Sequence, residues 1–307
     1  MFHMRKVAVI GMGNVGAAVA HQLVVGGHAD DLYLYDTNEA KVNADALDFE
    51  DSMDNVPFNV NITVNDYEAL KDVEVIVSAL GHIKLLDVPH PDRFAELKYN
   101  RKEVAEVGAK IKASGFHGVL IDITNPCDAI CQLYKEATGL PYEKIIGTGT
   151  LLDSARLHRA VGKFFGVHPK AVKGYSLGEH GDSQFVAWST VKVFEQPITE
   201  LIKEKNMNLD AIDEETREGG FTVFYGKKYT NYGIAAAAVR LVDAVLSDSK
   251  EQMPVSNYRE EYHSYLSYPA IVGREGIVKQ CQLDLTQEEL QKLQHSADTI
   301  LSKAQAE

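Results

Sequence analysis

Short apolar runs alternate with longer amphipathic stretches over the first half of the chain. Runs with few polar residues are typical of parallel strands that helices cover on both faces. We expect strands at 6–10, 31–35, 60–64, 73–80, 119–123 and 144–146, with helices at 17–25, 39–50, 93–114 and 128–138. This order predicts an α/β fold with a doubly wound sheet of six parallel strands.

The pattern changes after residue 147, where strands and helices no longer alternate regularly. Strands are expected near 171–175 and 185–193, further strand and turn signals run from 255 to 279, and helices are expected at 151–165, 200–205, 210–225, 231–247 and 287–304. We therefore expect two domains, a doubly wound domain over residues 1–147 and an α+β domain over residues 148–307.

A glycine-rich turn follows the first predicted strand. It consists of Gly11, Met12, Gly13, Asn14, Val15 and Gly16. In the dinucleotide-binding form of this turn, the first glycine permits the sharp bend, the second lets a pyrophosphate approach the backbone, and the third lets helix and strand pack closely. The N-terminus of the following helix would then face the phosphates with unpaired N–H groups.

The second strand ends in Asp36, twenty residues after Gly16. An acid at this place can accept hydrogen bonds from an adenine ribose, and its charge would repel the 2′-phosphate of NADP. The alternative is a helix N-cap at Asp36. Strand, turn, helix, strand and acid together predict a Rossmann-type domain with NAD as the cofactor. Because ligands bind at the carboxyl ends of such strands, we expect Gly81 and Asn125 to face the same crevice.

The composition excludes several classes of partner. The formal net charge is −13, which argues against nucleic acids and anionic membranes. No apolar run reaches the roughly 18 residues of a spanning helix. Residues 1–6 lead directly into a strand, so we expect no signal peptide and a cytoplasmic protein.

The three cysteines, Cys127, Cys131 and Cys281, are too few and too scattered for a disulfide framework or a zinc site. Cys127 and Cys131 lie one helical turn apart. We expect them to be small core residues in a reducing compartment, and we predict no metal site.

The sequence around one histidine is typical of a residue that exchanges a proton with a substrate. His180 lies between Gly178-Glu179 and Gly181, after a predicted strand. Flanking glycines leave an imidazole accessible, and histidine exchanges protons near neutral pH, as oxidation of an alcohol to a ketone requires. The alternative is a turn histidine bonded to backbone.

Two charged residues in the helix that opens the second predicted domain strengthen this interpretation. Asp153 and Arg156 are three residues apart in a predicted helix, so both project from one face. Asp153 could orient the histidine, and Arg156 could bind a carboxylate through two parallel hydrogen bonds. The alternative is a surface ion pair. Arg93 follows the irregular stretch 82–92 and could close over a substrate, or lie in solvent at a helix start.

These segments resemble the lactate/malate dehydrogenase family of NAD-dependent L-2-hydroxy-acid dehydrogenases, and within it the branch that acts on 2-hydroxyisocaproate. The resemblance covers nearly the whole chain. It is carried by residues 11–22, 93–98, 114–120, 147–156, 178–191 and 266–270. The Leu-Asp-Ser-Ala-Arg and Gly-Glu-His-Gly-Asp-Ser segments, in this order and separation, are the most specific of these.

The resemblance implies a role for each candidate residue. His180 would accept the proton in alcohol oxidation and donate it in ketone reduction, with Asp153 as its partner. Arg156 would bind the substrate carboxylate, and Arg93 would lie on a loop that closes over the substrate. Asn125 would bond the reacting oxygen beside the cofactor. Thr230 would line the substrate pocket, and Ile234 would pack near the nicotinamide.

Departures from the lactate and malate enzymes predict the substrate class. The loop that carries the family's specificity residue is longer here, so Ile83 to Leu86 are all candidates, including Lys84, Leu85 and Leu86. The two leucines suit an apolar side chain, whereas Lys84 could receive a second carboxylate. Gly219 and Gly220 should enlarge the pocket. We therefore expect branched or longer aliphatic 2-oxo acids such as 2-oxoisocaproate, each methylene contributing about 1–3 kcal/mol.

Two alternatives remain open from the sequence. The first is an L-lactate or malate dehydrogenase. The second is an NAD-binding protein without catalysis, which the presence of His180, Asp153, Arg156 and Arg93 argues against. The apolar cluster 221–225 is expected in the core or in an interface. The family habit implies a homo-oligomer, with a tetramer as our expectation.

Overall fold

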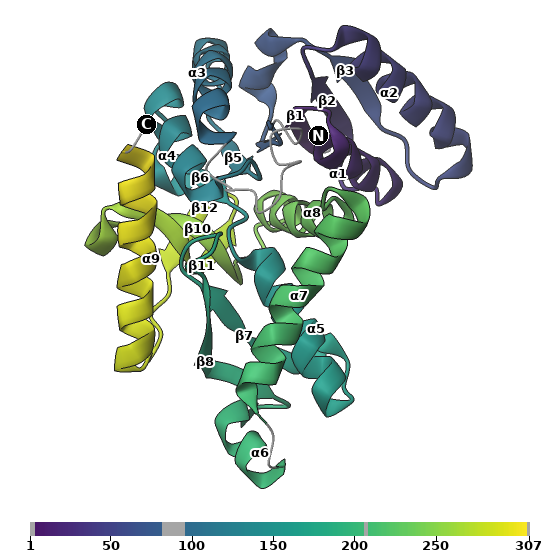
Figure 1. The fold of residues 1–307 in the computed structure, drawn as a ribbon. Coiled ribbons are helices and arrows are strands. Elements are labelled where there is room, and N and C mark those ends of the chain that lie inside the picture. Colours follow the sequence, from purple (N-terminus) through teal and green to yellow (C-terminus); the bar gives the residue numbers. More distant parts are fainter. Residues whose placement is uncertain (1–3, 82–95, 206–207, 306–307) are drawn as a thin grey trace.

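The computed structural model describes residues 4–81, 96–205 and 208–305 (Figure 1). Six parallel strands form one side of its larger sheet, as the sequence predicts. In spatial order they are β3 (Asn61–Val64), β2 (Asp31–Tyr35), β1 (Lys6–Ile10), β4 (Val75–Ser78), β5 (Val119–Asp122) and β6 (Ile145–Gly147). The strand order reverses at β1 and β4, which is where ligands bind in such sheets.

Alternate residues of β1 belong to two separate cores, because successive side chains of a strand point to opposite faces. Val7 and Val9 pack with α1 (Asn14–Val25) and α2 (Glu39–Ser52). Ala8 and Ile10 pack on the other face with α3 (Leu97–Ser114) and α4 (Cys127–Thr138). Both faces are covered, which explains why these strands carry no polar face.

Helix α1 begins three residues earlier than the sequence predicts. Glycine is a poor helix former, which is why residue 17 was the expected start. Gly16 nevertheless lies inside the helix, because the first turn of α1 packs directly on the backbone of Gly11. A Cβ on residue 16 would come within 1.8 Å of the Gly11 carbonyl oxygen. Only glycine allows helix and turn to approach this closely.

The second half of the chain completes the first sheet. Strands β10 (Glu251–Arg259), β11 (Ser264–Gly273) and β12 (Gly276–Gln280) form an antiparallel meander, and β10 pairs with β6 through Ser256 and Gly147. The sheet therefore has nine strands in the described chain. The sequence indicated strands between 255 and 279 but not their place beside β6.

Helix α8 (Tyr232–Leu246) also returns to the first half, where it packs against α1, β4 and β5 (Figure 1). Its apolar residues belong to the same core as α1. The predicted division at residue 147 separates the elements by their position in the sequence. In the structure, one hydrophobic core contains elements from both sides of that residue, such as α1 and α8.

The remaining elements form a separate layer below the large sheet in Figure 1. A small sheet contains β7 (Val172–Leu177), β8 (Phe185–Val193) and β9 (Gln196–Pro197), and the helices are α5 (Leu151–Phe165), α6 (Ile198–Lys205) and α7 (Leu209–Lys227). Helix α9 (Gln287–Gln305) packs on β11 and β8. Over the described ranges, no helix is both long and apolar enough to cross a bilayer.

Two expectations about side chains have mixed outcomes. Cys127 and Cys131 are buried as predicted, whereas Cys281 is only partly buried. The cluster 221–225 is not in the core, because Phe221 and Tyr225 are more than half exposed on α7.

Candidate active site

Helix α5 is fixed at its N-terminus by three hydrogen bonds to strands of both sheets. The Thr150 hydroxyl donates to the Ser176 carbonyl at 2.5 Å, and the Ser154 hydroxyl accepts the Ser176 N–H at 3.0 Å. The Thr150 N–H donates to the Ser267 hydroxyl at 3.0 Å. These bonds set the position of the first turn of α5, which carries Asp153 and, three residues on, Arg156.

The loop that carries His180 is fixed at both sides. Gly178, with φ of +92°, exchanges two backbone hydrogen bonds with Ser267 of β11, at 3.0 and 2.8 Å. The Glu179 carboxylate accepts the backbone N–H and the hydroxyl of Ser183, at 3.0 and 2.5 Å. The loop therefore holds its shape without relying on the histidine side chain.

Asp153 connects the two functional side chains. Its Oδ2 lies 2.8 Å from His180 Nδ1, and its Oδ1 accepts a hydrogen bond of 2.8 Å from Arg156 Nη1. The side chains of Asp153, His180 and Arg156 are 6%, 15% and 19% exposed. Neither sequence alternative fits this geometry, because the ion pair is largely buried and the imidazole faces a carboxylate.

The arrangement determines which histidine nitrogen can exchange a proton. A carboxylate beside Nδ1 keeps a proton on that atom, so Nε2 is the atom that accepts or donates. Asp153 also lies in the first turn of α5, where the positive end of the helix favours a negative charge. The cluster is thus suited to accept a proton at Nε2 and to bind an anion at Arg156.

Asp128 is a part of this site that the sequence analysis did not identify. It lies in the first turn of α4, where its Oδ2 accepts the backbone N–H of His180 at 2.8 Å and its Oδ1 accepts the Ser256 hydroxyl at 2.5 Å. Burial raises the pKa of Asp128 to about 6, against the opposing effect of these two donors. An acid two residues after an Asn-Pro pair, in the first turn of a helix, was the available signal.

The turn that carries Asn125 lies between β5 and α4. The side chain of Asn100, on α3, donates to the Asn125 carbonyl at 2.6 Å, and the Asn125 side chain is half-buried. The turn and the His180 loop are connected through Asp128, which follows Asn125 by three residues. A role for Asn125 in bonding the reacting oxygen stays a prediction.

The glycine turn has the features that a bound dinucleotide needs. Gly11 has φ of +91°, and a Cβ placed on Gly13 would have no neighbour within 4 Å. No side chain caps the N-terminus of α1. The exposed Gly13 and Asn14 therefore leave room for a pyrophosphate beside unpaired backbone N–H groups.

Asp36 is bonded both to this turn and to Asn38, which precedes the next helix. Its Oδ2 accepts the Met12 N–H at 2.7 Å, and its Oδ1 accepts the Asn38 N–H at 2.8 Å. The N-cap of α2 is Asn38, whose side chain accepts the Lys41 N–H, so the alternative of an N-cap at Asp36 is wrong. Each carboxylate oxygen still has a free lone pair for a ribose hydroxyl.

A cavity of about 540 Å³ borders the same turn. Gly13 and Asn14 form one end of it, and α1, Lys41, Asn231 and Tyr232 form its other walls. It lies along α1, between α1 and the start of α8.

The remaining predicted site residues fall into four groups. Gly220 faces Arg156, since a Cβ there would lie 3.4 Å from the guanidinium, whereas Gly219 faces Arg159 and is not brought to the cluster. Thr230 lies two residues before α8, whereas Ile234 lies in its first turn and packs against the first core. Val15 lies in α1 and Gly81 follows β4. Arg93, Lys84, Leu85 and Leu86 lie outside the described residues.

Comparison with known proteins matches both halves of the chain. Residues 5–147 match the family model described as the lactate/malate dehydrogenase NAD-binding domain, and residues 150–306 match the lactate/malate dehydrogenase α/β C-terminal domain. The chain is 33% identical over 304 residues to L-lactate dehydrogenase 1 of Bifidobacterium longum subsp. longum, covering 96% of this chain and 95% of that protein.

Solved structures agree over the full length. The minor L-lactate dehydrogenase of Enterococcus mundtii, in its ligand-bound form, superposes with a TM-score of 0.93 at 30% identity, covering 99% of this chain and 98% of that one. The lactate dehydrogenase of Cryptosporidium parvum, in complex with lactic acid and nicotinamide adenine dinucleotide, gives a TM-score of 0.92 at 29% identity. That match covers 100% of this chain and 98% of the other.

Proposed function

The chain belongs to the lactate/malate dehydrogenase family, and from this premise we propose that it reduces a 2-oxo monocarboxylic acid, pyruvate first among them, to the L-2-hydroxy acid. It is an NAD-dependent oxidoreductase that acts on the CH–OH group of 2-hydroxy acids. The observation that carries the proposal is Asp153, which is bonded to both His180 and Arg156 in one largely buried cluster.

Arg156, His180 and Asp153 each have a separate role in the proposed reaction. Bound NADH supplies the hydride. Arg156 binds the substrate carboxylate through paired N–H groups and so fixes the orientation of the 2-oxo group. His180 gives its Nε2 proton to the oxygen as that oxygen gains electron density, and Asp153 keeps the other proton on Nδ1. In alcohol oxidation the same Nε2 accepts the proton.

Pyruvate is placed first because the relatives reported above are named L-lactate dehydrogenases. The branched or longer aliphatic acids predicted from the sequence are the second candidate. Gly220 supports them, since it has no side chain at a position 3.4 Å from the Arg156 guanidinium. The missing side chain leaves space beside the group that binds the carboxylate.

We expect pyruvate or 2-oxoisocaproate to exceed oxaloacetate at least tenfold in kcat/KM, which corresponds to about 1.4 kcal/mol of transition-state preference. The measurement is NADH oxidation on these three acids. Pyruvate in the lead supports the first candidate, and 2-oxoisocaproate in the lead supports the second. Oxaloacetate in the lead would contradict a monocarboxylic substrate.

The same panel on two matched variants tests the pocket wall. In Gly220→Ala the new methyl group lies beside Arg156, so kcat/KM for 2-oxoisocaproate should fall relative to pyruvate by about 10-fold or more. In Gly219→Ala it meets the mobile end of Arg159, which already pairs with Glu215, and the ratio should not change. Equal effects from both variants would rule out a pocket wall at Gly220.

We also propose that the protein is a homo-oligomer. Phe221, Tyr225 and Tyr232 are 56%, 57% and 74% exposed, and the rings of Phe221 and Tyr225 stack at 6.2 Å. Exposed aromatic side chains such as these are enriched where proteins contact one another. Molar mass from light scattering should exceed that of the 33.9 kDa chain, and a monomer would refute the proposal.

A further inference from the structure

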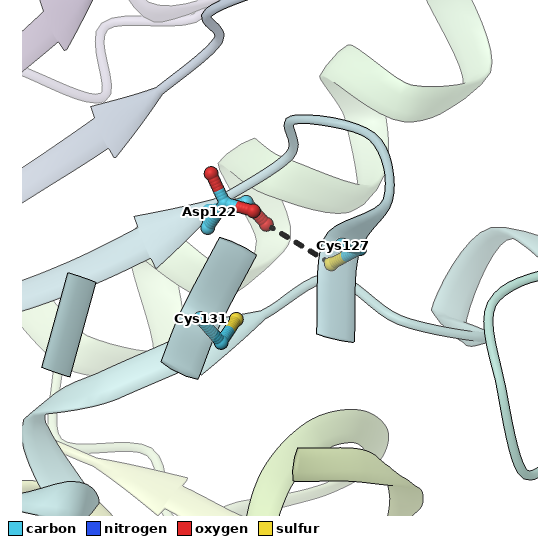
Figure 2. Close-up of side chains that lie close together, drawn as sticks. All are labelled: Asp122, Cys127 and Cys131. Atoms are coloured by element: carbon cyan, nitrogen blue, oxygen red, sulfur yellow. Dashed lines mark hydrogen bonds between the residues drawn. The ribbon is translucent and has the colours of Figure 1, made fainter. Parts of the chain in front are cut away.

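A second cluster of reactive side chains lies behind the turn that carries Asn125. Asp122 ends β5 and, two residues after Leu120, points to the face that α4 covers. Cys127 and Cys131 face it from the first two turns of α4 (Figure 2). One ligand atom from each of the three residues lies within 4.8 Å of the other two, and all three residues are buried.

Within the described residues, neither oxygen of the buried Asp122 carboxyl meets the distance and angle of a regular hydrogen bond, although Thr124 and the Ser78 hydroxyl lie close enough to interact with it. The hydroxyl of Ser78, its neighbour in register on β4, is bonded to Tyr134 at 2.7 Å. A buried polar group without a regular hydrogen bond is rare in proteins, and a bound ion is one of the few arrangements that satisfies it.

The surroundings are shaped around the two sulfur atoms. Gly147 of β6 lies against them, and a Cβ there would come within 2.6 Å of Cys127 Sγ and 2.8 Å of Cys131 Sγ. The Cys127 thiol is directed to the Asp122 backbone carbonyl, at 3.7 Å. Cys127 is also the first residue of α4, whose N-terminus has no side-chain cap and carries partial positive charge.

We propose that Asp122, Cys127 and Cys131 bind one zinc ion. Two thiolates and a carboxylate are the ligands that Zn²⁺ prefers, and with three protein ligands its fourth position goes to water. Binding releases one proton from each thiol and one from the carboxyl. The complex then has one net negative charge, which the N-terminus of α4 stabilises. The cysteine spacing alone gives no zinc signature, because the third ligand comes from a strand.

The place of the cluster indicates a structural role. Asp122 and Cys127 lie on either side of the turn 124–126, so one ion would join the end of β5 to the start of α4. Asp128, the next residue of α4, holds the His180 N–H. The ion would therefore stabilise a turn and a helix start that support the site, without contacting the substrate.

Cadmium titration of the reduced, full-length protein tests the proposal. Cd²⁺ is a thiolate-binding substitute for Zn²⁺ that gives a sulfur-to-metal absorption band. We expect one Cd²⁺ per chain with this band, and one Zn²⁺ per chain by elemental analysis after dialysis. Cys131→Ser and Asp122→Asn should each weaken binding at least tenfold, whereas Cys281→Ser, which changes a cysteine outside the cluster, should bind like the wild type.

Folding of each variant is checked by NADH binding and circular dichroism. Asp122→Asn keeps the shape of the side chain, so it gives the answer if Cys131→Ser does not fold. Three results would overturn the proposal: no sulfur-to-metal band in folded wild-type protein with excess Cd²⁺, unchanged binding in both cluster variants, or loss of binding in Cys281→Ser.

Discussion

His180→Ala is expected to lower kcat by about 10²–10⁴-fold, the usual contribution of a positioned general acid or base. The variant removes the imidazole but keeps the backbone N–H that donates to Asp128, so the loop should stay in place. NADH affinity should be close to that of the wild type, because Asp153 and Asp128, which bond His180, lie in α5 and α4 and not in the glycine turn. Steady-state rates and NADH fluorescence measure the two effects.

A matched control is His117→Ala, which removes an exposed histidine at the turn between α3 and β5. Its kcat should equal that of the wild type. Near-wild-type turnover in His180→Ala would show that another group carries the proton, and parallel loss of NADH binding would show that the variant disturbs the fold.

Asp153→Asn is expected to lower kcat and to raise KM together. Asp153 accepts one hydrogen bond from Arg156 and faces His180 Nδ1 with its other oxygen, whereas asparagine has only one oxygen. In either orientation its NH₂ group faces one of these partners. Facing His180, it would force the proton to Nε2, which could then not accept one. Facing Arg156, it would remove a charge-assisted bond of about 1.5–3 kcal/mol.

The combined loss in kcat/KM should reach about 10²–10⁴-fold, with most of it in kcat for alcohol oxidation. Rates in both directions with varied substrate separate the two parameters. Asp182→Asn, at the exposed acid two residues after His180, is the control and should change neither. A change in KM alone would mean that Asp153 positions only the arginine.

Site residues could be predicted from the sequence where their arrangement depends only on residues close to them in the sequence. Asp153 and Arg156 share one helix face, and the glycine turn is continuous, so short-range geometry was enough to anticipate both. The positions of Asp128 and Asp122 depend on which strand lies beside which helix. Asp122 follows three apolar residues in β5, and an acid in such a run is the signal that marks it.

The parts of the fold that the sequence did not predict also depend on which elements lie side by side. The hydrophobic periodicity predicts that residues 255–279 form strands. The same periodicity is expected of a strand that pairs within its own domain and of one that pairs with β6, so it does not identify the neighbouring strand. Gly219 and Gly220 show the same limit at the scale of single residues. They are adjacent in sequence, but a 100° step around α7 turns one to Arg159 and the other to Arg156.

The return of β10 and α8 to the first sheet has a consequence for the order in which the protein can be made. When Gly147 has been synthesised, the edge of β6 is still unpaired and the apolar side of α1 is uncovered. About 110 further residues must follow before Arg259 completes β10. At 5–20 residues per second, the growing chain carries this open edge for roughly 5–20 s. The nucleotide-binding half is the first part to be translated, but its core is closed only near the end of translation.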